Sequence, residues 1–295
     1  MINISFFSYK GGAGRTSLLF NTLPFLAEAL KATPEEPIIV IDLDIDSKGL
    51  TYLIDRECDV NAIQVLKGEI PHNPRLATSI GAHPFFSKLI PIGADVGLDD
   101  RLDKSILFIP VPKSGVFLGM NNADGKNISL NKFREICKMM RCKAIVMDTP
   151  TGSQLSGECA LSISHKIVTV MRITKQFNIG TREFLSEKAK HFNNKEFIIV
   201  PNAVPPVPYV NGVPKYDMDK IFKRISNNAK SALGEDGDNY LNLTFLQDGM
   251  YGINEVNSFK FDELNLRQEA KTRDLIDDET QAIKSYEILA EELKR

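Results

Sequence analysis

The chain has 295 residues, of which 43% are hydrophobic and 25% charged, as in an ordinary globular protein. Its net charge of −2 excludes a general attraction to nucleic acid or an anionic membrane, so either would require a local basic patch. The first residues lack a signal-peptide pattern, and no apolar run is long enough to span a bilayer. These features predict a cytoplasmic protein with no membrane attachment, in which the four cysteines are reduced and mostly buried.

Short apolar strands alternate with helical patterns along the chain. In chain order we predict strand Ile2–Ser8, helix Thr16–Lys31, strands Pro37–Leu43 and Ile106–Val111, helix Leu130–Met140, strands Ala144–Met147 and Lys166–Met171, helix Thr181–His191, strand Phe197–Pro201, helix Asp217–Leu233, a weaker strand Thr244–Leu246 and helix Thr280–Lys294. Pro205–Pro214 is expected to be a rigid loop. Such strands and helices predict an α/β fold, a doubly wound and mostly parallel sheet with helices on both faces, in a single domain spanning residues 1–295.

A glycine-rich segment, Lys10–Ser17, joins the first strand to the first helix. Its glycines permit positive φ angles that point successive N–H groups inward, and the helix start adds its own free N–H groups. Triphosphate oxygens are the natural ligand, and the candidate binding residues are Gly11, Gly12, Ala13, Gly14, Arg15, Thr16 and Ser17. Two alternatives remain: a glycine-rich turn without a ligand, and a dinucleotide fingerprint, although Ser17 stands where that fingerprint needs a third glycine.

Acidic residues follow two of the predicted strands. Asp42 and Asp44 end the second strand, and Asp148 ends the strand that begins at Ala144. Carboxylates at strand ends, together with the hydroxyl of Thr16, suit Mg²⁺, a hard cation that prefers oxygen ligands. The candidate metal ligands are therefore Thr16, Asp148 and Asp42. For each acid the alternative is a structural cap of the following turn.

The loop and the acids resemble the deviant Walker A and Walker B motifs of the ParA/MinD family of P-loop ATPases. The matching loop positions are Lys10, Gly11, Gly12, Gly14, Thr16 and Ser17. Arg15 stands where the family has lysine, and Tyr9 stands at the first glycine of the usual Walker pattern. Looser similarity extends over nearly the whole chain, including Leu243–Glu255.

The resemblance implies ATP and Mg²⁺ as cofactors and two catalytic residues, Lys10 and Asp44. Lys10 would reach the nucleotide of a partner subunit in a face-to-face dimer, and Asp44 would position the attacking water. Arg15, where the sequence departs from the family, is a third catalytic candidate on its own chemistry. Its guanidinium is a planar fork of donors that suits two phosphate oxygens, and the alternative is a poor fit that slows turnover. Asn202, at the end of a strand, would contact adenine, whose edge needs both a donor and an acceptor.

The expected function is that of a slow ATPase that dimerises with ATP and positions DNA or a protein cargo, as in partitioning systems. The alternative is a non-hydrolysing switch or scaffold in which Arg15 holds ATP without turnover. The protein partner is unidentified. Nonspecific DNA has one candidate surface, the basic side of helix Asp217–Leu233, which carries Lys220, Lys223, Arg224 and Lys230. No membrane contact is expected at the last helix, where Glu287, Glu291 and Glu292 lie opposite the apolar side.

Overall fold

The computed structural model describes residues 1–71, 79–113, 123–152, 154–188, 191, 195–206, 208–233, 241–242, 252–253, 255–256 and 265–295. The strands of these ranges are β1 (Ile2–Phe7), β2 (Ile38–Asp42), β3 (Ile90–Pro91), β4 (Ile106–Ile109), β5 (Ala144–Asp148), β6 (Lys166–Met171), β7 (Glu196–Pro201), β8 (Tyr209–Val210), β9 (Val213–Pro214) and β10 (Leu241–Asn242). The helices are α1 (Arg15–Leu30), α2 (Gly49–Ile54), α3 (Ala62–Lys67), α4 (Ala123–Met139), α5 (Leu155–Ile163), α6 (Lys175–Lys188), α7 (Met218–Leu233), α8 (Leu266–Glu269) and α9 (Asp277–Lys294), with three short 3-10 turns, η1 (Ile80–Ala82), η2 (Phe86–Lys88) and η3 (Asp100–Ser105).

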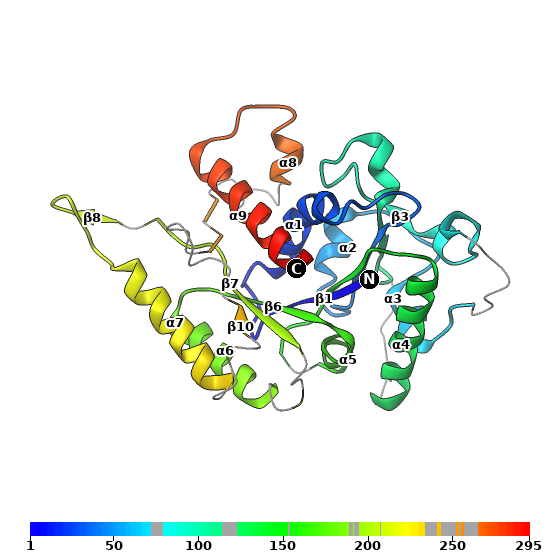
Figure 1. Cartoon of the computed structure of the whole chain (residues 1–295), viewed down its shortest axis with the longest axis horizontal. Helices are drawn as coiled ribbons and strands as arrows, with labels where there is room; N and C mark the ends of the chain where they lie inside the picture. The colour runs from blue at the N-terminus through cyan, green and yellow to red at the C-terminus, as the bar shows by residue number, and fades with distance from the viewer. Residues whose placement is uncertain are drawn as a thin grey trace.

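An eight-stranded sheet in the order β10-β7-β6-β1-β5-β2-β4-β3 forms the centre of the molecule (Figure 1). Its strands pair in parallel, except β3, which is antiparallel to β4. Alternate residues of β2 enter two different hydrophobic clusters, Ile38 and Val40 in one and Ile39 and Ile41 in the other. Burial on both faces is what a doubly wound parallel sheet requires, and it confirms the predicted fold class.

Helices cover both sides of the sheet. In Figure 1, α1 and α9 lie above the strands, and α5, α6 and α7 lie below them. Phe25 of α1 stacks on Tyr286 of α9, with ring centroids 6.2 Å apart, so the last helix packs on the domain as predicted. Glu292 differs from the expectation: it is buried and pairs with Arg295, because it lies on the side of α9 that contacts β6, where its carbonyl accepts from Lys166 Nζ.

Several elements depart from the predicted boundaries. Helix α6 begins at Lys175, six residues before the predicted start, and α5, whose partly exposed residues Leu155, Glu158 and Ser162 lie on one side, was not predicted. The segment expected to be a rigid loop contains the hairpin β8–β9, which projects from the body in Figure 1. Its turn residues Asn211 and Gly212 both have positive φ, 52° and 76°, which suits the tight turn of a two-residue hairpin.

All four cysteines are free; Cys137, Cys142 and Cys159 are buried and Cys58 is partly exposed. Within the described ranges, no helix is long and apolar enough to cross a membrane. The weak strand Thr244–Leu246 and most of Leu243–Glu255 lie outside the described residues.

Candidate functional site

Strand register brings the predicted loop and acids to one edge of the sheet. Strand β5 lies between β1 and β2, and Asp148 pairs in register with Phe6 on one side and Asp42 on the other. The glycine-rich segment starts at Lys10, separated from the end of β1 by two residues, so it lies beside the acids at the ends of β2 and β5. This is the carboxyl edge of the parallel strands, where open α/β sheets bind their ligands.

The glycine-rich loop is open on its outer face and held on its inner face. Gly12 and Gly14 have φ angles of 79° and 75°, and a Cβ added at Gly11 or Gly12 would meet no atom within 4 Å. A Cβ at Gly14 would lie 2.6 Å from Asn202 Nδ2. That amide donates to the carbonyls of Ala13 and Gly14 at 2.8 and 3.3 Å. Asn202 thus ties the end of β7 to the loop, and its contact with adenine stays a prediction.

Two further side chains fix the loop from the β6–α6 side. Arg172 Nε donates to the carbonyl of Gly12 at 3.1 Å. The ring of Tyr9 lies so close to α6 that a Cβ at Gly180 would be 2.1 Å from its Cδ1. Lys10, between Tyr9 and Gly11, is exposed.

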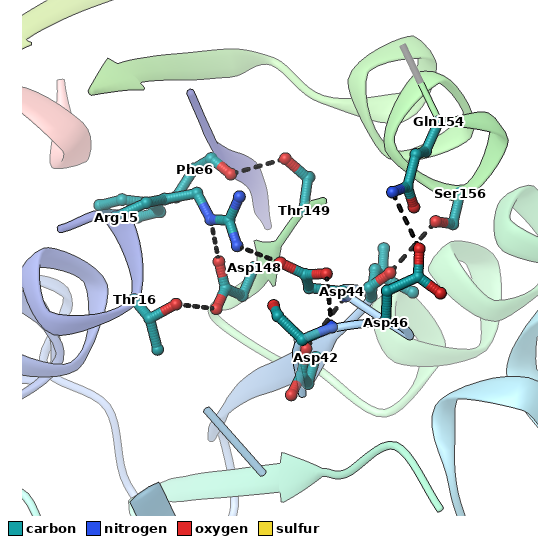
Figure 2. Close-up of polar contacts among 12 residues, drawn as sticks. Phe6, Arg15, Thr16, Asp42, Asp44, Asp46, Asp148, Thr149, Gln154 and Ser156 are labelled. Carbon is teal, nitrogen blue, oxygen red and sulfur yellow. Dashed lines mark hydrogen bonds and ion pairs between the residues drawn. The ribbon is translucent and has the colours of Figure 1, made fainter. Parts of the chain in front are cut away.

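Arg15 points into the acids (Figure 2). Its Nε donates to Asp148 Oδ1 at 2.5 Å and its Nη2 to Asp44 Oδ2 at 2.7 Å, and all three side chains are almost completely buried. Burial alone would lower the pKa of Arg15, but the charges of Asp148 and Asp44 outweigh it and raise the pKa. The guanidinium is therefore a permanent cation that holds the two carboxylates together.

Asp148 also contacts the first turn of α1. Thr16 Oγ1 donates to Asp148 Oδ2 at 2.8 Å, so both carboxylate oxygens have a partner. Burial raises the pKa of Asp148, and the Arg15 charge opposes that rise. The Thr16 hydroxyl and the Asp148 carboxylate are adjacent oxygen donors of the type that Mg²⁺ prefers, and by this donor chemistry they fit the metal.

Asp42 and Asp44 differ in their hydrogen bonds. Asp42 accepts from the backbone N–H of Asp44 and from both the N–H and the Oγ1 of Thr51, at 2.7–3.0 Å. Burial, followed by the charge of Asp148, raises the pKa of Asp42 to about 7. Asp44 accepts from the N–H of Ser47 and from Arg15. The bonds of Asp42 fix the β2–α2 loop, and its role as a metal ligand stays a prediction.

Arg172 and Thr51 were missed from the sequence. Arg172 follows the end of β6 directly, so the rule that singled out strand-end acids would also have found it. Thr51 gives no such signal, because its bond to Asp42 depends on how the β2–α2 loop folds back.

The strand, glycine loop and helix at the centre of this sheet order define a P-loop NTPase fold. No protein-family model and no curated protein sequence matches the chain. Solved structures do: the MinD cell division protein of Aquifex aeolicus has a TM-score of 0.63 at 15% identity, covering 99% of this chain and 97% of that one.

Two other matches are an ATP complex of McdA from Cyanothece (TM-score 0.59, 14% identity, 99% and 96% covered) and pNOB8 ParA bound to nonspecific DNA (0.53, 12%, 84% and 82%). The chain therefore has the fold of the ParA/MinD ATPases, as its loop predicted.

Proposed function

We propose that this protein is a ParA/MinD-like ATPase that binds ATP with Mg²⁺ at Gly11–Ser17, dimerises face to face and hydrolyses ATP slowly to position a partner. The observation that carries the proposal is the meeting of an open phosphate loop with Asp44 and Asp148 at the carboxyl edge of three adjacent strands. The likeness to an ATP complex supports the choice of nucleotide.

Each residue has a role in this proposal. Backbone N–H groups of the loop and the Arg15 guanidinium bind the phosphates, Asn202 lies toward the base, and Lys10, which is exposed, extends to the second subunit. Thr16 and Asp148 hold Mg²⁺, which when bound withdraws charge from the phosphate oxygens. Asp44 orients the attacking water.

A second candidate, the non-hydrolysing switch, is favoured by one contact. Arg15 is paired with Asp44, the acid proposed to act on water, and a paired carboxylate is a weaker acceptor for a water proton. Phosphate release by the purified protein distinguishes the two candidates, because the switch binds ATP and releases none.

Thermal unfolding with ATP, with and without Mg²⁺, tests the proposed site. A ligand that binds only the folded chain raises its melting temperature, and we expect the rise to be larger with the metal. Thr16→Ala should remove most of the magnesium-dependent part, while Thr272→Ala, which removes an exposed hydroxyl away from the loop, is the control. Equal stabilisation of the parent by ATP with and without Mg²⁺ would contradict the assignment of Thr16 and Asp148.

The proposed DNA-binding surface is identified by its exposed basic residues. The basic residues of α7 are exposed, as expected from the sequence, and one match is a ParA bound to nonspecific DNA. We therefore propose α7 as the DNA-binding surface of this chain. A protein cargo and the ATP-dependent homodimer complete the proposal.

A further inference from the structure

The guanidinium of Arg15 has one edge without an acceptor. Nε and Nη2 are used by Asp148 and Asp44, whereas Nη1 is buried and has no hydrogen-bond partner among the described residues. A buried N–H group without a partner is unfavourable, because it has lost water and gained nothing. The free edge of Arg15 therefore lacks an acceptor that a ligand would supply.

The other two edges of the same guanidinium already donate to the acids, so Arg15 is the counter-ion of both carboxylates. Within the described part of the chain, Arg15 is the basic residue paired with Asp44 and Asp148, and Thr16 takes the second oxygen of Asp148. A divalent cation at Thr16 and Asp148 would stand next to this guanidinium in a buried site. Like charges repel strongly there, so the guanidinium and the metal compete for the same carboxylates.

We infer that Arg15 gates the metal: in the nucleotide-free protein it is the counter-ion of Asp44 and Asp148 and excludes divalent cations, and phosphate oxygens draw it away. The second half rests on the proposed function, since nucleotide phosphates are the acceptors that the free edge lacks. Once Arg15 turns to the phosphates, Asp148 is released for the metal and Asp44 for water. Metal binding therefore follows nucleotide binding. In the nucleotide-free protein, Asp44 and Asp148 stay paired with Arg15.

Titration of Mn²⁺ alone into the nucleotide-free protein tests the exclusion, with free Mn²⁺ measured by electron paramagnetic resonance. We expect Arg15→Gln to bind one Mn²⁺ per chain at least about tenfold more tightly than the parent, because a charge in direct contact with the site is lost. The double variant Arg15→Gln/Asp148→Asn should lose this binding again. Arg172→Gln is the matched control: it removes a cation that contacts the same loop at Gly12 but neither acid, and it should bind as the parent does.

Equal Mn²⁺ affinity of the nucleotide-free parent and Arg15→Gln would overturn the exclusion. Circular dichroism checks that each variant is folded. Should Arg15→Gln fail to fold, Arg15→Lys keeps a charge but pairs with one acid at a time, and it should bind Mn²⁺ more tightly than the parent.

A second experiment tests whether nucleotide releases Asp148 from Arg15. Because ATP itself chelates Mn²⁺, the parent is compared with Asp148→Asn at equal ATP occupancy, and the ATP-bound parent should hold Mn²⁺ more tightly. Equal Mn²⁺ affinity of the two ATP-bound proteins would overturn the release by nucleotide. A complete failure of ATP to bind, measured by calorimetry, would instead overturn the proposed function, whereas the metal exclusion is still decided by the nucleotide-free titration.

Discussion

Arg15 replaces the compact charge of a lysine by a planar group with donors on three sides. A lysine ammonium at this position would pair with one carboxylate at a time, whereas the guanidinium joins Asp44 and Asp148 simultaneously. Removing one partner of such a buried set leaves an uncompensated charge, which costs about 3–5 kcal/mol. The residue that departs from the family resemblance is therefore both a structural clamp and a candidate phosphate ligand.

Burial changes the protonation of Asp42 within the ordinary pH range. Its pKa of about 7 lies above the value of about 4 for an exposed aspartate, so the folded chain keeps a proton that the unfolded chain releases. The Asp42 contribution to the free energy of unfolding is then lost as the pH rises from about 4 to about 7. Above that range the buried carboxylate is charged and destabilises the fold.

We predict that Asp42→Asn, which cannot ionise, gains stability relative to the parent as the pH rises. Between about pH 5 and about pH 8 the difference in unfolding free energy should move by about 1–3 kcal/mol in favour of the variant. Urea unfolding at both pH values measures it, with the exposed Asp46→Asn as control. A difference that is the same at both pH values would show that Asp42 is not protonated in the folded chain.

At the scale of secondary-structure elements, the candidate site residues lie at the ends of strands, whereas the candidate DNA-binding surface lies on helix α7. The end of each central strand, and not its interior, carries the candidate residues, because register alone places Phe6, Asp148 and Asp42 at one level. Helix α7 is different: its buried side, including Phe222 and Ile225, packs on the domain, and its basic side faces solvent. The proposed DNA-binding role of α7 therefore depends on its exposed basic side chains and not on the register of the strands.

We predict that Lys223→Glu/Arg224→Glu weakens nonspecific DNA binding more than tenfold at low salt. Each lost phosphate contact should also make the slope of log affinity against log salt less negative by about 1. Fluorescence anisotropy with a random duplex at several salt concentrations measures both effects. Lys132→Glu/Lys138→Glu, the same charge change on the exposed side of α4, is the control. Equal losses in the two double variants would mean that α7 is not a specific surface for DNA.

For the whole molecule, the proposed cycle predicts a change of assembly. Asp44→Ala should still bind ATP, because Asp44 is assigned to water and not to the phosphates, but it should accumulate as a nucleotide-bound dimer. Size-exclusion chromatography with light scattering, together with phosphate release, measures this, and Asp46→Ala is the matched control. Hydrolysis at the parental rate by Asp44→Ala would make Asp44 the wrong residue and direct attention to Asp42.

Much of this architecture could be predicted from local signals. Apolar runs located every central strand, and a glycine loop between a strand and a helix located the candidate site. Helix α5 was missed because it is only nine residues long and its partly exposed side carries one charged residue, Glu158. The β8–β9 hairpin was missed although Asn211-Gly212 is a strong turn signal. The contacts of Arg15 with residues 29 and 133 positions away depend on the assembled sheet, and no local pattern contains them.

The contact of Tyr9 with Gly180 constrains how this chain can diverge. The usual Walker loop has glycine at the position of Tyr9, and here the glycine required for space lies across the gap, in the middle of α6. Glycine inside a helix costs about 1 kcal/mol relative to alanine, so selection for helix stability alone would replace it. A relative with a small residue at position 9 is free to carry alanine at position 180, whereas a chain with the tyrosine is not. Positions 9 and 180 are therefore sterically coupled in this chain, and Gly180→Ala should be tolerated better beside a small residue at position 9 than beside the tyrosine.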